Sequence, residues 1–175
     1  MRFPLRAQSA ITLLGLATLA ALGASSCGET VDFKQALQVT DLSGGWYDAG
    51  IVDGKNKLVP LVRFRIRKQP DARLRAVDVN VHFKFVAPDA RDSKEAETEL
   101  DDVFLQKLEF SEGNQTALLT VQADTGFTAD PPQTRAEMLA HRLFRDVRAR
   151  IFAKQSSTTW VELASHDLPR VLITK

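Results

Sequence analysis

Two successive stretches between Leu58 and Phe85 alternate apolar and polar residues with a period of two. This pattern is typical of strands that bury one face and leave the other in water. The turn-forming residues 69–72 separate the two stretches, so the alternation predicts a β-hairpin. The positions expected to face inward are Leu58, Pro60, Val62, Phe64, Ile66, Val77, Val79, Val81, Phe83 and Phe85.

The two apolar faces also predict the register of this hairpin. Pairing Phe64 with Val79 keeps both faces on one side of the sheet. That register places Arg65 opposite Asp78, and a slip by two residues places Arg63 there instead. We expect Phe64 and Val79 to be almost fully buried, whereas an exposed Arg–Asp pair contributes only about 0–1 kcal/mol to stability.

A second pair of stretches with alternating apolar and polar residues covers residues 147–154 and 159–163. Matching the inner faces of these two strands places Phe152 beside Trp160 on the outer face. The same register places Arg150 beside Glu162. A second β-hairpin is therefore expected, with aromatic and charged pairs on its outer face.

Residues 133–145 carry a helical pattern in place of a strand pattern. Thr134 and Glu137 have the spacing of a capping box, so we expect a short helix that connects two strands. Its inward positions would be Ala136, Leu139 and Leu143. Weaker strand patterns occupy residues 34–40, 46–52, 103–110, 116–123 and 170–174.

The order of these elements favours one fold class. About eight short strands, one helix and no regular alternation of strands with helices are typical of an immunoglobulin-like antiparallel β-sandwich. The chain has 175 residues, 44% hydrophobic and 26% charged, which suits a single domain that we place at residues 34–175. Within it, we expect residues 44–50 to form a bend or bulge where an edge strand crosses between sheets, and Asp53-Gly54 to form a turn.

Residues 1–26 have the features of a secretory signal peptide. Arg2 and Arg6 precede an uncharged apolar run from Ala10 to Ala24, which is shorter than the roughly 20 residues that span a bilayer. Small residues follow as far as Cys27, the only cysteine of the chain. We therefore expect the mature chain to begin at Cys27.

The sequence Ala24-Ser25-Ser26-Cys27 resembles the lipobox of bacterial lipoproteins, in which the cysteine thiol is acylated and becomes the first residue. The resemblance implies that Cys27 is the lipidation site, that residues 27–33 are a short tether, and that the lipid holds the protein on a membrane. Ala24 stands where the commonest lipobox has Leu, so signal cleavage without lipidation is the alternative. Gly28, in place of Asp, implies sorting to the outer membrane with the domain facing the periplasm.

A lipidated N-terminus followed by one sandwich is similar to the small bacterial envelope proteins that carry immunoglobulin-like domains of the FxLYD kind. The Phe-x-Leu-Tyr-Asp motif itself does not occur, and Trp46-Tyr47-Asp48 is its nearest counterpart. The resemblance therefore implies an architecture and no activity.

The acidic run from Glu95 to Asp102 is the first candidate for a polar site. Glu95, Glu97, Glu99 and Asp101 alternate, so an extended backbone would place their carboxylates on one side. A Ca²⁺ site is one interpretation, because this cation takes six to eight oxygen ligands. We favour a solvated loop or a charged edge strand that discourages pairing with other chains.

Other polar residues give no recognisable catalytic pattern. His82, His141 and His166 lack the spacing of zinc ligands, and Ser165-His166-Asp167 are sequence neighbours that cannot form a proton relay. A net charge of +1 without a block of Lys or Arg argues against nucleic acid as a partner. We expect no metal and no cofactor.

Aromatic residues are the best candidates for contact with a protein partner. Trp46 and Tyr47 lie among glycines, and Phe152 with Trp160 would form an outer patch near Arg150. The alternative is that the rings cover the core. We favour this alternative for both pairs of residues, and more strongly for Trp46. The sequence thus predicts a lipid-anchored, non-enzymatic binding or structural module of the cell envelope. The alternative is a hydrolase or metal-dependent enzyme whose site is assembled from scattered carboxylates and histidines.

Overall fold

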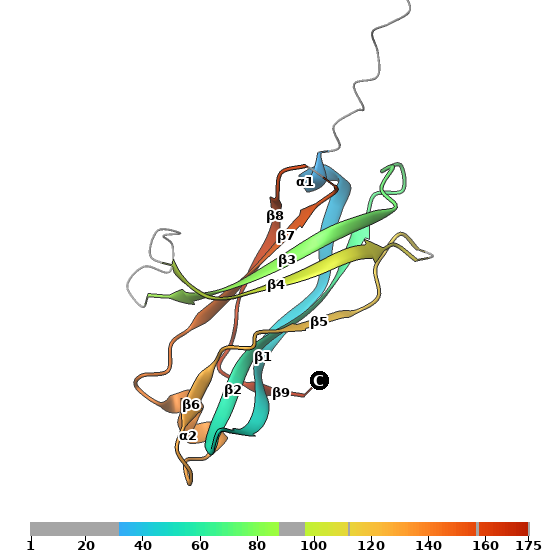
Figure 1. Cartoon of the computed structure of the whole chain (residues 1–175). Coiled ribbons are helices and arrows are strands. Elements are labelled where there is room, and N and C mark those ends of the chain that lie inside the picture. Colours follow the sequence, from blue (N-terminus) through green and yellow to red (C-terminus); the bar gives the residue numbers. More distant parts are fainter. Residues whose placement is uncertain (1–31, 88–96, 112, 157, 175) are drawn as a thin grey trace, which may run out of the picture. The chain divides into compact units, whose positions relative to one another are not determined.

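A computed structural model describes residues 32–87, 97–111, 113–156 and 158–174 of the chain (Figure 1). Residues Val31–Lys175 form one compact unit. The described residues are mostly strand, with two short helices. The elements are α1 (Phe33–Ala36), β1 (Leu37–Val52), β2 (Lys55–Lys68), β3 (Ala76–Val86), β4 (Glu97–Glu109), β5 (Leu119–Gln122), β6 (Phe127–Ala129), α2 (Arg135–Ala140), β7 (Val147–Lys154), β8 (Val161–Asp167) and β9 (Leu172–Ile173).

The strands form two sheets. The first, sheet A, has the order β5-β2-β1-β9, with β6 also paired to β2, and the second, sheet B, has the order β4-β3-β7-β8. All pairings are antiparallel except the short contact between β1 and β9. With β1, β2 and β5 as strands A, B and E, and β3, β4, β7 and β8 as C, C′, F and G, this is the order of an immunoglobulin-like sandwich. The predicted fold class is confirmed.

The core lies between the two sheets and is built from the inward residues of the alternating strands. Phe64 and Val79 have no exposed surface, as predicted. Inward side chains of sheet A (Leu58, Val62, Phe64 and Ile66) and of sheet B (Val77, Val79, Val81, Phe83, Val147, Ala149, Ile151 and Ala153) belong to one buried cluster. Burial of this apolar surface is the main stabilising contribution to the fold.

The predicted hairpin between residues 58 and 85 is wrong, although both of its strands exist. β2 pairs with β1 and β5, whereas β3 pairs with β4 and β7. Residues 69–75 therefore carry the chain from one sheet to the other, and Phe64 and Val79 meet across the core. The alternation defines the inward face of each strand, but two strands with inward apolar faces can equally well be neighbours in one sheet or partners in opposite sheets.

The predicted hairpin of β7 and β8 is confirmed, with a different register. Phe152 pairs with Glu162 and Arg150 pairs with Ser165, because a bulge lies between Ile151 and Phe152. The Arg150 and Glu162 side chains are nevertheless in contact, as expected. A bulge adds one unpaired residue to a strand, so it shifts a register that was counted from a regular ladder.

Residues 37–52 form one long strand where the sequence predicted two shorter ones. Residues 44–50 stay within sheet A, so the predicted crossing between sheets is wrong, but a bulge does lie between Asp48 and Gly50. Gly50 has φ +82°, and its N–H donates to Asp48 Oδ1 at 2.8 Å. The predicted turn at Asp53-Gly54 is confirmed, with φ values of 51° and 77°.

α2 confirms the predicted helix in a shorter form. The capping box of Thr134 and Glu137 is present. Of the predicted inward positions, Leu139 is buried, whereas Ala136 is exposed. The helix ends at Ala140, so Leu143 lies beyond it and is 65% exposed, and Met138 is the second buried residue of the helix. Within the described ranges no helix is long and apolar enough to cross a membrane.

Candidate functional site

The outer face of sheet B carries the polar and aromatic residues singled out in the sequence. On β7, inward small and aliphatic residues alternate with half-exposed outward ones, and β3 follows the same rule. The strands are adjacent, so their outward residues form rows across the sheet. These rows are Asp78 with Lys154, Asn80 with Phe152, His82 with Arg150, and Lys84 with Arg148.

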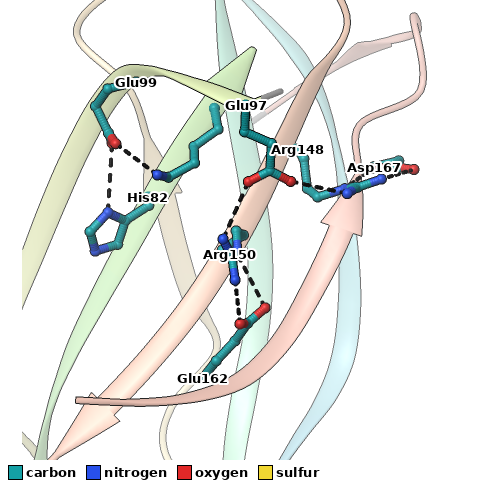
Figure 2. Close-up of polar contacts among 8 residues, drawn as sticks. His82, Glu97, Glu99, Arg148, Arg150, Glu162 and Asp167 are labelled. Atoms are coloured by element: carbon teal, nitrogen blue, oxygen red, sulfur yellow. Dashed lines mark hydrogen bonds and ion pairs between the residues drawn. The ribbon is translucent and has the colours of Figure 1, made fainter. Parts of the chain in front are cut away.

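Glu97 lies at the centre of a charged network on this face (Figure 2). Its Oε1 accepts a hydrogen bond from Arg148 Nη1 at 3.0 Å, and its Oε2 accepts one from Arg150 Nη1 at 3.3 Å. The Glu97 side chain is only 1% exposed. The carboxylate is therefore removed from water and depends on the two guanidinium groups for its partners.

Each arginine also binds a second carboxylate. Arg148 Nη2 donates to Asp167 at 3.1 Å, and Arg150 Nε donates to Glu162 at 3.1 Å. These hydrogen bonds, to Asp167 for Arg148 and to Glu162 for Arg150, raise the pKa of both guanidinium groups. The chain of alternating charges holds both arginine side chains in place by charge-assisted hydrogen bonds.

His82 contacts two carboxylates on the same face. Its Nδ1 lies 3.6 Å from Glu99 Oε1, and its Nε2 lies 3.9 Å from Asp102 Oδ1. Glu99 also pairs with Lys84 Nζ at 3.1 Å. Because the carboxylates approach opposite ring nitrogens, the three groups do not point at one position. No cluster of three or more His, Cys, Asp or Glu residues in the described part of the chain is placed to hold a metal ion.

The acidic run forms the start of β4, an edge strand, as we favoured, although Glu95 lies outside the described residues. A register shift between the pairs of Phe83 and Lys84 separates Asp101 from the outer carboxylates. Asp101 accepts hydrogen bonds from the N–H groups of Asp124 and Thr125 at 2.7 and 3.0 Å. Burial alone would raise the pKa of Asp101, but backbone hydrogen bonds lower it overall. The expectation that all these carboxylates are solvated is wrong for Glu97.

Aromatic side chains occupy the other part of the outer face. Phe104 is 44% exposed and meets Trp160 edge to face, with ring centroids 5.6 Å apart. Lys154 Nζ lies 4.7 Å from the Trp160 ring centroid. Phe152 contacts His82 at 4.8 Å, so the described ring contacts do not include the predicted neighbours Phe152 and Trp160. We call Phe104, Phe152 and Trp160 the aromatic surface.

Phe104 was missed by the sequence analysis. It lies between Val103 and Leu105, so three apolar residues in a row hide the alternation that marks an outward position. The pairing of Asn80 with Phe104 places it on the outer face.

Trp46 is not part of any exposed patch. Its side chain is 1% exposed and packs against Phe144 with ring centroids 4.4 Å apart. The structure thus removes Trp46 from the candidate partner-binding residues. Tyr47 points to the opposite face of β1, where it is half-buried and pairs in the register with Val59 and Ile173. Cys27, the predicted lipidation site, lies outside the described residues.

The other candidate catalytic residues are scattered. Asp167 binds Arg148, whereas His166 lies at the next position of the strand and therefore faces the other side of sheet B. His141 caps the C-terminus of α2. Comparisons with protein-family models, with curated proteins and with solved structures found no match for this chain. Its function must be inferred from the surface itself.

Proposed function

We propose that this chain is a lipid-anchored protein of the bacterial cell envelope that binds another envelope component, without catalysis, through the outer face of sheet B. The observation that carries the proposal is the contact of the exposed Phe104 ring with the half-buried Trp160 ring. Aromatic residues bordered by arginine are the usual anchors of protein interfaces. Phe104 lies on β4 and Phe152 on β7, and Trp160 directly precedes β8. Strands are rigid supports for a binding surface.

The charged network supports the same proposal. Arg150 lies 5.5 Å from the Phe152 ring centroid and is held by Glu97 and Glu162. A partner therefore meets side chains whose positions are already fixed, so little conformational entropy is lost on binding.

The N-terminal sequence supports the anchor and the location. Cys27 follows a short apolar run and three small residues, and Gly28 follows Cys27. We infer acylation of Cys27 and a domain that faces the periplasm from the outer membrane.

The alternative of a hydrolase or metal-dependent enzyme receives less support. His82, Glu99 and Asp102 are the predicted residues that do come together, and they lie on an open sheet face with the two carboxylates on opposite sides of the ring. His141 and His166 lie on other elements.

Crosslinking in cells, followed by capture of the full chain, tests the binding surface. We expect a partner captured by the wild-type chain to be lost with Trp160→Ala and with Phe104→Ala, because an interface anchor is worth about 2 kcal/mol or more. The matched control is Ile51→Ala, which removes an exposed apolar side chain from β1 of sheet A. Capture that survives both aromatic substitutions would refute the surface.

Metabolic labelling with a fatty acid tests the anchor. We expect label on the wild-type chain and none on Cys27→Ser, which should also leave the membrane fraction. An unlabelled wild-type chain, or a Cys27→Ser chain that still sediments with membranes, would refute the lipid anchor. Neither result would affect the proposal for the binding surface.

A further inference from the structure

One end of the sandwich is strongly basic. The polypeptide enters the domain there through α1, and the connection from β2 to β3 lies beside it (Figure 1). The N–H of Gln69 donates to the carbonyl of Ala36 at 2.9 Å, which joins the connection to the helix. We call residues 32–36 and 67–75 the basic end.

The basic end has five cationic side chains and two acidic ones, and the exposed Glu109 lies beside it, because Glu109 pairs with Ala76. The cations are Lys34, Arg67, Lys68, Arg73 and Arg75, and the acids are Asp32 and Asp71. Lys68 donates to backbone carbonyls of the connection. The other four cations are exposed, and no ion pair or side-chain hydrogen bond to them is present among the described residues.

Cations at the other end of the sandwich, around α2, are mostly paired. Lys55 pairs with Asp130, Arg135 with Asp48, and Arg170 with Asp146. Arg142 is exposed and has no such partner among the residues that the structure describes. The chain as a whole carries only +1, so the excess of positive charge is a local property of the basic end. A local excess of this kind attracts an anionic surface.

The short distance along the chain between Cys27 and Asp32 indicates that the anionic surface is the membrane that carries the anchor. Five residues span at most about 18 Å when fully extended. A lipid on Cys27 would therefore hold the basic end close to the headgroups of its own membrane, where electrostatic attraction acts over a screening length of about 8 Å.

We infer that the basic end docks on anionic lipid headgroups of the membrane that carries the anchor. The inference rests on the proposed lipid anchor. Docking through Lys34, Arg67, Arg73 and Arg75 would fix the orientation of the domain and direct the α2 end away from the membrane. Each cation close to an anionic membrane is expected to strengthen docking roughly fivefold.

Hydrogen exchange of the processed, lipid-bearing chain tests the inference. The chain is reconstituted in vesicles of phosphatidylcholine alone, or of phosphatidylcholine mixed with phosphatidylglycerol, so the anchor is the same in both. We expect exchange of amides in residues 69–75 to be slowed by at least about fivefold in the anionic vesicles, the factor expected of even a single cation. Residues 141–146, near α2, serve as the internal control and should exchange equally in both.

Charge variants identify the docking residues. Replacing Lys34, Arg67, Arg73 and Arg75 with Gln should remove the protection, whereas Lys55→Gln with Arg142→Gln at the other end should retain it. In the native chain, 1 M salt shortens the screening length to about 3 Å and should also remove the protection. The salt measurement keeps the test valid if the fourfold variant does not fold.

Equal exchange in the two kinds of vesicle would overturn the inference. So would protection that appears only when a soluble anionic polysaccharide is added, because the basic end would then recognise a glycan. A chain that does not float with phosphatidylcholine vesicles would instead show that the anchor is absent. Flotation is measured separately from the exchange rates, so the two failures can be distinguished.

Discussion

At the scale of single residues, Phe64 and Arg65 are neighbours on β2 with opposite surroundings. Phe64 has no exposed surface and lies in the core, whereas Arg65 is partly exposed on the other face of the strand. Successive side chains of a strand point to opposite faces whatever the neighbouring strand is. The two positions should therefore contribute very differently to stability.

Phe64→Ala and Arg65→Ala test these directions. Phe64→Ala leaves a cavity between the sheets and should lower the free energy of unfolding by about 3–5 kcal/mol. Arg65 pairs with Asp41 at 3.2 Å near the surface, so Arg65→Ala should cost about 1 kcal/mol or less. Chemical denaturation measures both, and equal losses would contradict the assignment of the faces.

Glu97 is the residue whose importance the sequence did not reveal. Glu97→Gln removes the charge that two arginines share in a site away from water, so we expect a loss of about 2 kcal/mol in the free energy of unfolding. Glu99→Gln is the matched control, because the Glu99 side chain is 50% exposed and should cost less than about 1 kcal/mol. A Glu97→Gln variant as stable as Glu99→Gln would show that the network contributes nothing to folding.

At the scale of elements, the sequence predicted strands better than their partners. β7 and β8 are joined by a short connection and form the predicted hairpin, with a shifted register. β2 and β3 are also close in sequence, but their connection crosses between the sheets. Whether two consecutive strands pair with each other or lie in different sheets depends on their partners elsewhere in the chain, such as β1 for β2 and β7 for β3. Local alternation carries no information about those partners.

The contact between α2 and β1 makes a prediction about pH. Arg135 Nε donates to Asp48 Oδ2 at 2.8 Å, and this hydrogen bond holds the pKa of Asp48 below its usual value of 3.8. The ionised carboxylate therefore adds stability at pH values above about 4, and this contribution is lost as the pH falls through the lowered pKa.

Asp48→Asn measures this contribution against the wild-type chain. We expect the variant to be less stable at neutral pH, by about 1 kcal/mol or less for a half-exposed pair, and the difference to shrink as the pH falls below about 4. Taking the difference between the two chains removes the effect of other carboxylates that titrate in the same range. A difference that stays constant down to the lowest pH would contradict the assigned pair.

At the scale of the whole molecule, composition and element order predicted the sandwich, and residue types predicted part of the candidate surface. Arg150 and Phe152 lie on the outer face of β7, as the sequence predicts, and Trp160, directly before β8, contacts Phe104 of the same face. Phe104 and Glu97 join them from β4, whose position at the edge of sheet B depends on long-range pairing. Trp46 is also an aromatic residue in a strand pattern, but it belongs to the buried cluster, where its ring packs against Phe144.

The central claim is that the aromatic surface is available to a partner and is not a cover of the core. The most direct measurement compares the free energies of unfolding of Trp160→Ala and Trp46→Ala. Trp46→Ala should lose about 3–5 kcal/mol, because it opens a cavity beside Phe144. Trp160→Ala should lose about 1 kcal/mol or less, as expected for a surface substitution. A loss of about 3–5 kcal/mol for Trp160→Ala would show that this ring stabilises the fold as Trp46 does, and would contradict the proposed binding surface.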